Sequence, residues 1–174
     1  MKIKKLNLES NPLPGNKTID ANGHLLNTNC IYFNIDKLKD TFISCNEIEA
    51  AYIFGSAARC EPVVNDLDLL ILATSNANVH KLYFNLVHNI ANDQKIPESQ
   101  IDILFFDIHL ADPFILDQAI NTGVLLYNKN EKLLTDRIEA LSLFFIENEP
   151  LLNESIRLKR EQREVFCGNR SPKD

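Results

Sequence analysis

Residues 51–72 read AYIFGSAARCEPVVNDLDLLIL, and this stretch predicts a strand, a glycine turn, a loop and a second strand. The first apolar run, AYIF, stops at Gly55-Ser56, where a glycine that can adopt positive φ allows a sharp turn with exposed backbone N–H groups. The second run opens with Asp66 and Asp68 and continues as four apolar residues, which is typical of a strand buried on both faces. We expect the rest of the fold to be built around these two strands.

Asp66 and Asp68 stand two residues apart, so on a strand their carboxylates face one side, with Cα atoms about 6.5 to 7 Å apart. Such a pair can share two divalent ions about 3.5 to 4 Å apart, an arrangement that stabilises an in-line phosphoryl displacement. The Gly55-Ser56 turn would provide N–H groups and a hydroxyl for a phosphate if a helix begins near Ser56.

Each motif alone is usually a plain turn or a solvated strand end, but the two together form a narrow pattern. The pattern predicts a third carboxylate on a neighbouring strand. Asp102 fits this prediction, because it is the one charged residue in the apolar run IDILFF at residues 101–106. We expect Asp102 to be buried, which would require a metal ion or another partner.

The segments GSAARCEPVVNDLDLLIL and IDILFF resemble the nucleotidyltransferase superfamily of DNA polymerase β, and within it the minimal nucleotidyltransferase (MNT) family. The resemblance covers residues 36–127. It implies an α+β fold with a small mixed sheet backed by helices. It also implies that Asp66, Asp68 and Asp102 are the catalytic residues and bind two Mg²⁺ ions.

The same resemblance implies that Gly55 and Ser56 hold the phosphate of a nucleotide and that Arg59 contacts the triphosphate. Cys60 and Asn65 stand where MNT proteins commonly have Gly and Ser, and the loop is one residue shorter than usual. None of these departures removes a carboxylate.

The chain of 174 residues is 45% hydrophobic and 24% charged, which is the composition of one soluble globular domain. It contains no apolar run near the roughly 18 residues that a membrane span needs, and its first residues lack the apolar core of a signal peptide. We therefore expect a cytoplasmic protein. The four cysteines are widely spaced and predicted to be reduced, and the four histidines form no metal or triad pattern.

The net charge of −6 is unevenly distributed, because residues 61–128 contain two lysines and nine acidic residues. All three candidate metal ligands fall in this segment. An acidic segment favours cations, whereas a nucleic-acid groove needs a basic stripe. The charge pattern thus argues against nucleic-acid binding and against a polymerase role.

We expect three segments along the chain: an N-terminal arm at 1–33 with a hairpin at Asn22-Gly23, a nucleotidyltransferase core at 34–128, and a C-terminal helical segment and tail at 129–174. In the last segment, Pro150 is expected to break the helix. The charged helix after it is either a solvated face or a surface for a partner, including a second copy of the chain.

Three helices and a short strand complete the predicted core. Asn34 is a candidate cap for the first helix, and an amphipathic helix with its apolar stripe at 79–91 ends at Lys95-Ile96-Pro97. Asp112, followed by proline, starts a third helix that Gly123 closes. A short strand at 123–127 follows.

The predicted reaction is metal-dependent transfer of a nucleoside monophosphate, AMP from ATP, to a hydroxyl group with release of pyrophosphate. By resemblance to MNT antitoxins, the acceptor is a tyrosine of a HEPN-domain toxin. One alternative is a small-molecule nucleotidyltransferase of the aminoglycoside-modifying kind. Another is an inactive module that neutralises its partner by binding alone.

Overall fold

The computed structural model describes residues 31, 33–59, 61 and 64–168. The arm predicted at 1–33, including its hairpin at Asn22-Gly23, lies almost wholly outside this range. The chain divides into two compact units, Met1–Thr135 and Asp136–Asp174.

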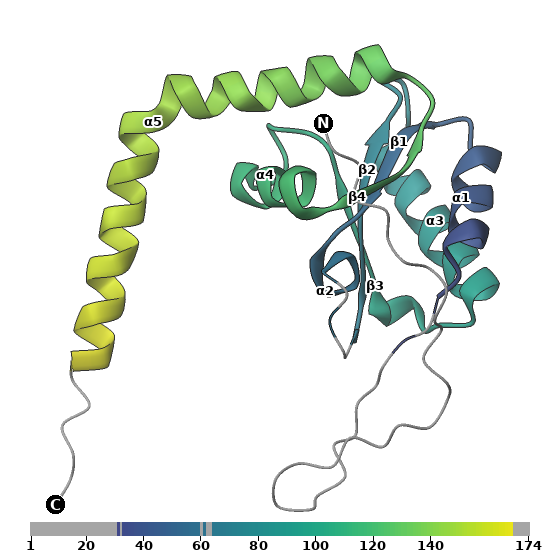
Figure 1. The fold of residues 1–174 in the computed structure, drawn as a ribbon, viewed down its shortest axis with the longest axis horizontal. Helices are drawn as coiled ribbons and strands as arrows, with labels where there is room; N and C mark the ends of the chain where they lie inside the picture. The colour runs from purple at the N-terminus through teal and green to yellow at the C-terminus, as the bar shows by residue number, and fades with distance from the viewer. Residues whose placement is uncertain (1–30, 32, 60, 62–63, 169–174) are drawn as a thin grey trace, which may run out of the picture. The chain divides into compact units, whose positions relative to one another are not determined.

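The first unit contains a four-stranded mixed sheet with the strand order β3-β2-β1-β4 (Figure 1). β1 (Ile48–Ile53) pairs antiparallel with β2 (Leu67–Ala73) and with β4 (Val124–Asn128). β3 (Ile101–Phe105) pairs parallel with β2. The predicted α+β fold with a small mixed sheet is confirmed.

β1 begins three residues before the predicted strand and ends before Phe54. All six of its residues are buried, because β2 and β4 flank it on both sides. Even Glu49 is only 8% exposed, and its Oε1 atom lies 3.8 Å from Lys129 Nζ. The sequence did not indicate this buried carboxylate.

The expectation that Asp102 is buried was wrong, because its side chain is exposed. β3 lies at an edge of the sheet, and β2 is its one strand neighbour in the described part of the chain. An apolar run on an edge strand is covered less completely than one in the centre of a sheet. β2 does have neighbours on both sides and is buried along most of its length, as predicted.

Helices cover both faces of the sheet (Figure 1). α1 (Ile35–Ser44) and α3 (Val79–Gln94) pack on one face and form the main core with it. α2 (Gly55–Ala58) and α4 (Pro113–Thr122) lie on the other face. Side chains of the main core include Leu38, Phe42, Ile53, Leu69, Ile71, Leu82, Leu86 and Ile90.

Side-chain caps fix where the helices begin. Asn34 Oδ1 accepts a hydrogen bond from the Lys37 N–H at 3.1 Å, and Asp112 Oδ1 accepts one from the Phe114 N–H at 2.9 Å. Both caps were predicted. Each satisfies one N–H group that has no acceptor within its helix. The helix after Asp112 ends at Gly123, also as predicted.

Gln94 joins the start of α1 to the end of α3 through two reciprocal hydrogen bonds. Its Oε1 accepts from the Asn34 N–H at 2.6 Å, and its Nε2 donates to the Asn34 carbonyl at 3.2 Å. Gln94 is only 9% exposed, so these bonds satisfy a polar group that would otherwise be costly to bury. The end of α3 is thereby held against the beginning of α1.

The expected break at Pro150 was wrong, because α5 (Glu131–Gly168) continues through this residue. Proline removes one hydrogen bond and favours a kink, but the helix can resume on its far side. In its described part, the second unit consists of this helix from Asp136 onward. None of the helices that the structure describes has the length and apolar content to cross a membrane.

Candidate active site

The turn after β1 is fixed by Gly55, which has a φ of 66° and opens the short helix α2. The Phe54 N–H donates to the Asp68 carbonyl at 3.0 Å, so the turn begins directly beside Asp68. A Cβ atom on Gly55 would overlap Asp68 Oδ2 and stand 2.8 Å from Asp68 Cγ. Glycine is therefore required both for the backbone conformation and for the close approach to Asp68.

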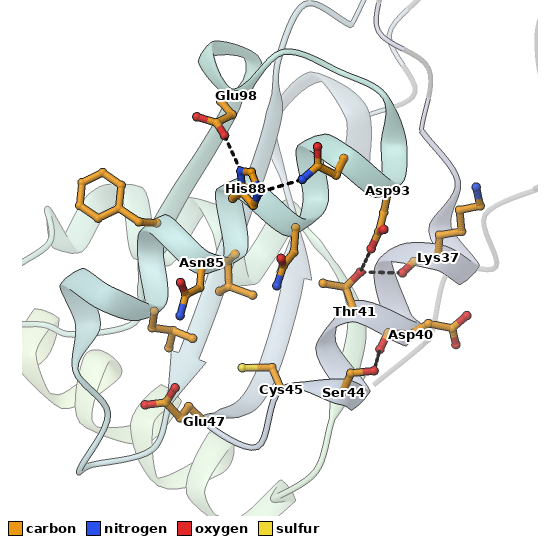
Figure 2. A pocket seen from close by; sticks show the side chains of 15 residues that line it. Lys37, Asp40, Thr41, Ser44, Cys45, Glu47, Asn85, His88, Asp93 and Glu98 are labelled. Atoms are coloured by element: carbon orange, nitrogen blue, oxygen red, sulfur yellow. Dashed lines mark hydrogen bonds and ion pairs between the residues drawn. The ribbon is translucent and has the colours of Figure 1, made fainter.

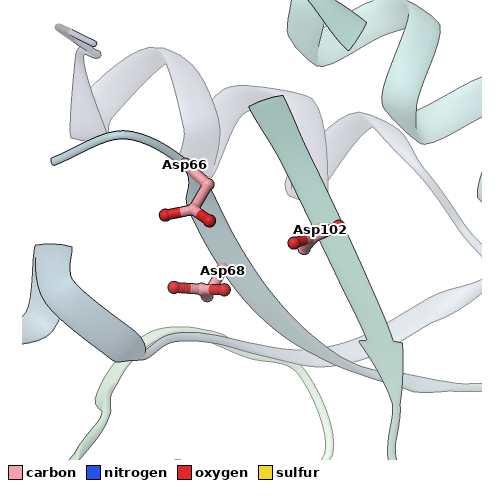
Figure 3. Close-up of side chains that lie close together, drawn as sticks. All are labelled: Asp66, Asp68 and Asp102. Carbon is pink, nitrogen blue, oxygen red and sulfur yellow. The ribbon is translucent and has the colours of Figure 1, made fainter. Parts of the chain in front are cut away.

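The three candidate aspartates come together at one end of β2 and β3 (Figure 3). Asp66 lies just before β2, and the parallel register places Asp68 directly opposite Asp102. A carboxylate oxygen from each of the three lies within 4.8 Å of the others. The sequence predicted that Asp102 would lie on a neighbouring strand; metal binding by the three side chains stays a prediction.

Asp68 is half-buried, whereas Asp102 is exposed. Burial raises the pKa of Asp68 to about 6, with further increases from the charges of Asp66 and Asp102. Arg59 acts in the opposite direction and lowers the pKa. Three acidic groups this close repel each other, and a cation between them would relieve that repulsion.

This repulsion predicts how the stability of the metal-free protein depends on pH. The folded-state pKa of Asp68, about 6, is above its ordinary value of 3.8. Asp68 therefore contributes stability that is fully present below pH 3.8 and lost as the pH rises through about 6. We expect the free energy of unfolding of wild type, relative to Asp68→Asn, to fall across this range.

Urea unfolding in EDTA at a series of pH values measures this difference. Asp117→Asn, on α4 and outside the carboxylate group, is the control. A difference between wild type and Asp68→Asn that stays constant from pH 4 to pH 7 would contradict the prediction.

Ser56 presents a hydroxyl group at the start of α2. Its Oγ atom is buried and makes no hydrogen bond within the described part of the chain. A buried hydroxyl without a partner is costly, and an unpaired group of this kind calls for an explanation. A phosphate oxygen of a bound nucleotide would satisfy it.

Arg59 directly follows α2 and makes a hydrogen-bonded ion pair with Glu61. Arg59 Nε donates to Glu61 Oε1 at 2.6 Å. Glu61 was not predicted as a site residue, because its one signal in the sequence is an Arg-x-Glu spacing that occurs often by chance. The contact between Arg59 and a triphosphate stays a prediction.

A separate pocket of about 1100 Å³ lies between α1 and α3 (Figure 2). Its walls contain the hydrogen bond from Thr41 Oγ1 to Asp93 Oδ2, 3.2 Å long, and the 3.1 Å contact between His88 Nδ1 and Glu98 Oε1. None of the residues predicted to act in catalysis or nucleotide binding lines this pocket. We place the candidate active site at the aspartates and not in this pocket.

Comparison with solved structures finds similar folds in toxin–antitoxin complexes. A crystal structure of a toxin–antitoxin with AMP-PNP has a TM-score of 0.53 and 16% sequence identity, covering 71% of this chain and 98% of that chain. Two mutants of the toxin–antitoxin pair MntA-HpeT give TM-scores of 0.52 and 0.53 at 15% and 16% identity. They cover 71% and 72% of this chain and 98% and 99% of theirs. At these identities the similarity establishes the fold alone.

Comparison with curated proteins finds no match. The family described as polymerase beta nucleotidyltransferase matches residues 36–132, which is more than half of the 174 residues. This range contains the glycine turn and all three aspartates. The chain therefore belongs to the polymerase beta nucleotidyltransferase family.

Proposed function

We propose that the protein is a metal-dependent nucleotidyltransferase that transfers AMP from ATP to a hydroxyl acceptor and releases pyrophosphate. The observation that carries this proposal is the set of carboxylate oxygens from Asp66, Asp68 and Asp102, within 4.8 Å of one another beside the Gly55 turn. Carboxylate oxygens are the ligands that Mg²⁺ prefers. The raised pKa of Asp68 and the unpaired hydroxyl of Ser56 also fit a site for cations and phosphate.

In this proposal Asp66 and Asp68 would hold two Mg²⁺ ions, and Asp102 would be a further ligand for one of them. When bound, such ions neutralise the triphosphate and lower the pKa of the acceptor hydroxyl. The triphosphate is positioned by the Gly55 turn, the Ser56 hydroxyl and the Arg59 guanidinium. Such positioning, together with electrostatic stabilisation, supplies most of the rate enhancement in phosphoryl transfer.

Asp102 is the candidate general base. Its carboxylate is exposed at the edge strand, so an acceptor hydroxyl can approach it from solvent. As the hydroxyl oxygen forms its bond to the α-phosphorus, the bond to the pyrophosphate oxygen breaks and Asp102 accepts the hydroxyl proton.

For the acceptor, we propose a tyrosine of a HEPN-domain toxin, with this chain as the antitoxin. The similarity in fold to toxin–antitoxin structures, one of them with AMP-PNP, supports this choice. The exposure of Asp102 also admits a small hydroxylated acceptor, so a small-molecule nucleotidyltransferase is the second candidate.

We expect nucleotide binding to depend on a divalent metal. Residues 61–128 contain two lysines and nine acidic residues, and this excess of negative charge would repel a triphosphate in the absence of cations. Calorimetric titration with ATP, in Mg²⁺ and in EDTA, measures the dependence. Equal affinity in the two buffers would count against a metal site.

Transfer itself is tested by incubating the protein with Mg²⁺, ATP labelled on the α-phosphate and a candidate acceptor. Label on a tyrosine of a HEPN-domain toxin would support the antitoxin reaction, whereas label on an aminoglycoside would support the second candidate. Neutralisation of the toxin without any transfer would indicate an inactive binding module.

A further inference from the structure

Glu61 contacts Arg59, which is one of the residues proposed to bind the triphosphate. The distance from Arg59 Nε to Glu61 Oε1 is 2.6 Å, and the two side chains are 45% and 44% exposed. An ion pair this exposed adds little to stability. Its position beside the active site suggests a different role.

Backbone hydrogen bonds attach both residues to the glycine turn. The Arg59 N–H donates to the Gly55 carbonyl at 3.2 Å, and the Glu61 N–H donates to the Ser56 carbonyl at 3.1 Å. The ion pair is therefore anchored to the two residues proposed to hold phosphate. A substitution of the Glu61 side chain leaves its backbone bond in place.

The ion pair also uses a particular edge of the guanidinium group. Glu61 accepts from Nε, so the two terminal nitrogens of Arg59 lie outside this bond. These terminal nitrogens form a planar fork that suits phosphate oxygens. We propose that Glu61 is a positioning residue, which orients the Arg59 guanidinium for the triphosphate; this inference rests on the proposed function.

Charge alone predicts the opposite effect of Glu61. A carboxylate near a triphosphate repels it, so its removal should tighten nucleotide binding. Removal of a positioning residue should instead weaken nucleotide binding. Without Glu61 the Arg59 side chain would be ordered only when the nucleotide binds, and this ordering would cost conformational entropy. The sign of the change therefore separates the two roles.

The experiment compares Mg²⁺–ATP binding by calorimetry for wild type, Glu61→Ala and Glu61→Gln. We expect Glu61→Ala to raise Kd about two- to fivefold, the size of effect that exposed ion pairs support. Glu61→Gln keeps an acceptor oxygen for Nε and should bind at least as well as wild type. In steady state, Glu61→Ala should raise KM with kcat nearly unchanged.

Two controls accompany these variants. In an Arg59→Ala background, Glu61→Ala should cause no further loss of affinity, because Glu61 acts through Arg59. Glu154→Ala removes a similar pair on α5, where Glu154 Oε1 lies 2.6 Å from Arg157 Nη2, and should leave Kd unchanged.

Binding by Glu61→Ala that equals or exceeds that of wild type would overturn the inference, while the proposed function would stand. A further loss of affinity in the Arg59→Ala background would overturn it as well. If wild type itself fails to bind Mg²⁺–ATP, the proposed function fails, and this result needs no variant.

Discussion

Asp68→Asn is expected to lower AMP transfer by at least about 10²- to 10³-fold, the size of loss seen when one electrostatic group is removed from an active site. In EDTA at pH 7, the same variant should be as stable as wild type or more stable by about 0.5 to 2 kcal/mol. Asp68 is ionised at this pH although its pKa is raised to about 6 by burial and by two neighbouring carboxylates. The gain is modest, because the half-buried side chain is partly screened by solvent.

Mg²⁺ with ATP should reverse this order of stability. A ligand that binds only the folded state adds about 2.7 kcal/mol at a hundredfold excess over Kd, and Asp68→Asn should lose most of this increment. Asp66→Asn and Asp102→Asn should change in the same directions, with a smaller gain in EDTA for Asp102→Asn because the Asp102 side chain is exposed.

Melting curves of wild type and the three variants, in EDTA and in Mg²⁺–ATP, measure both effects together. If all three variants melt several degrees below wild type in EDTA, the aspartates stabilise the fold as acceptors of hydrogen bonds. The prediction that these three aspartates bind metal ions would then be wrong.

Gly55→Val is expected to abolish nucleotide binding and to destabilise the protein. A residue other than glycine in the left-handed region costs about 1 to 2 kcal/mol, and a β-branched residue costs more. Any Cβ at this position would also overlap Asp68 Oδ2 and stand 3.2 Å from Asp68 Cβ. The Asp68 carboxylate would have to move from its present position beside Gly55. Gly55→Ala should therefore show the same losses in a milder form.

Ser56→Ala is the matched comparison at the next residue. It removes one hydrogen bond to a charged group, about 1.5 to 3 kcal/mol of nucleotide binding. Because the Ser56 hydroxyl has no partner within the described part of the chain, the metal-free protein should keep or slightly gain stability. Calorimetry with Mg²⁺–ATP and melting curves in EDTA separate Ser56→Ala from Gly55→Val. Unchanged nucleotide binding in both variants would place the phosphate elsewhere.

The sequence was most informative where one local pattern determines the structure. Gly55 before a polar residue predicted the turn, and Asp112 before proline predicted a helix start. In both cases the conformation depends on residues within one turn of each other. Local chemistry was therefore sufficient.

Features that depend on distant segments were not predicted. Asp102 is exposed because β3 is an edge strand, and the apolar run around it does not reveal the strand order. Gln94 is buried because Asn34, 60 residues earlier, meets it in space. Pro150 was expected to end a helix that in fact continues, because a proline signals a lost hydrogen bond but not whether the chain recovers the helix.

The pairing of Asp68 with Asp102 has a consequence for how this protein can change in evolution. The two residues face each other because β2 and β3 are held in one register. The short helix η1 (Glu98–Gln100) leads directly into β3, so no loop residues between them could absorb a change in length. A shift of one residue would turn Asp102 to the other face of the sheet and bring Ile101 or Ile103 to its place. We expect the lineage to accept many amino-acid replacements in this connection but to reject deletion of a single codon, so that selection acts here on length more than on composition.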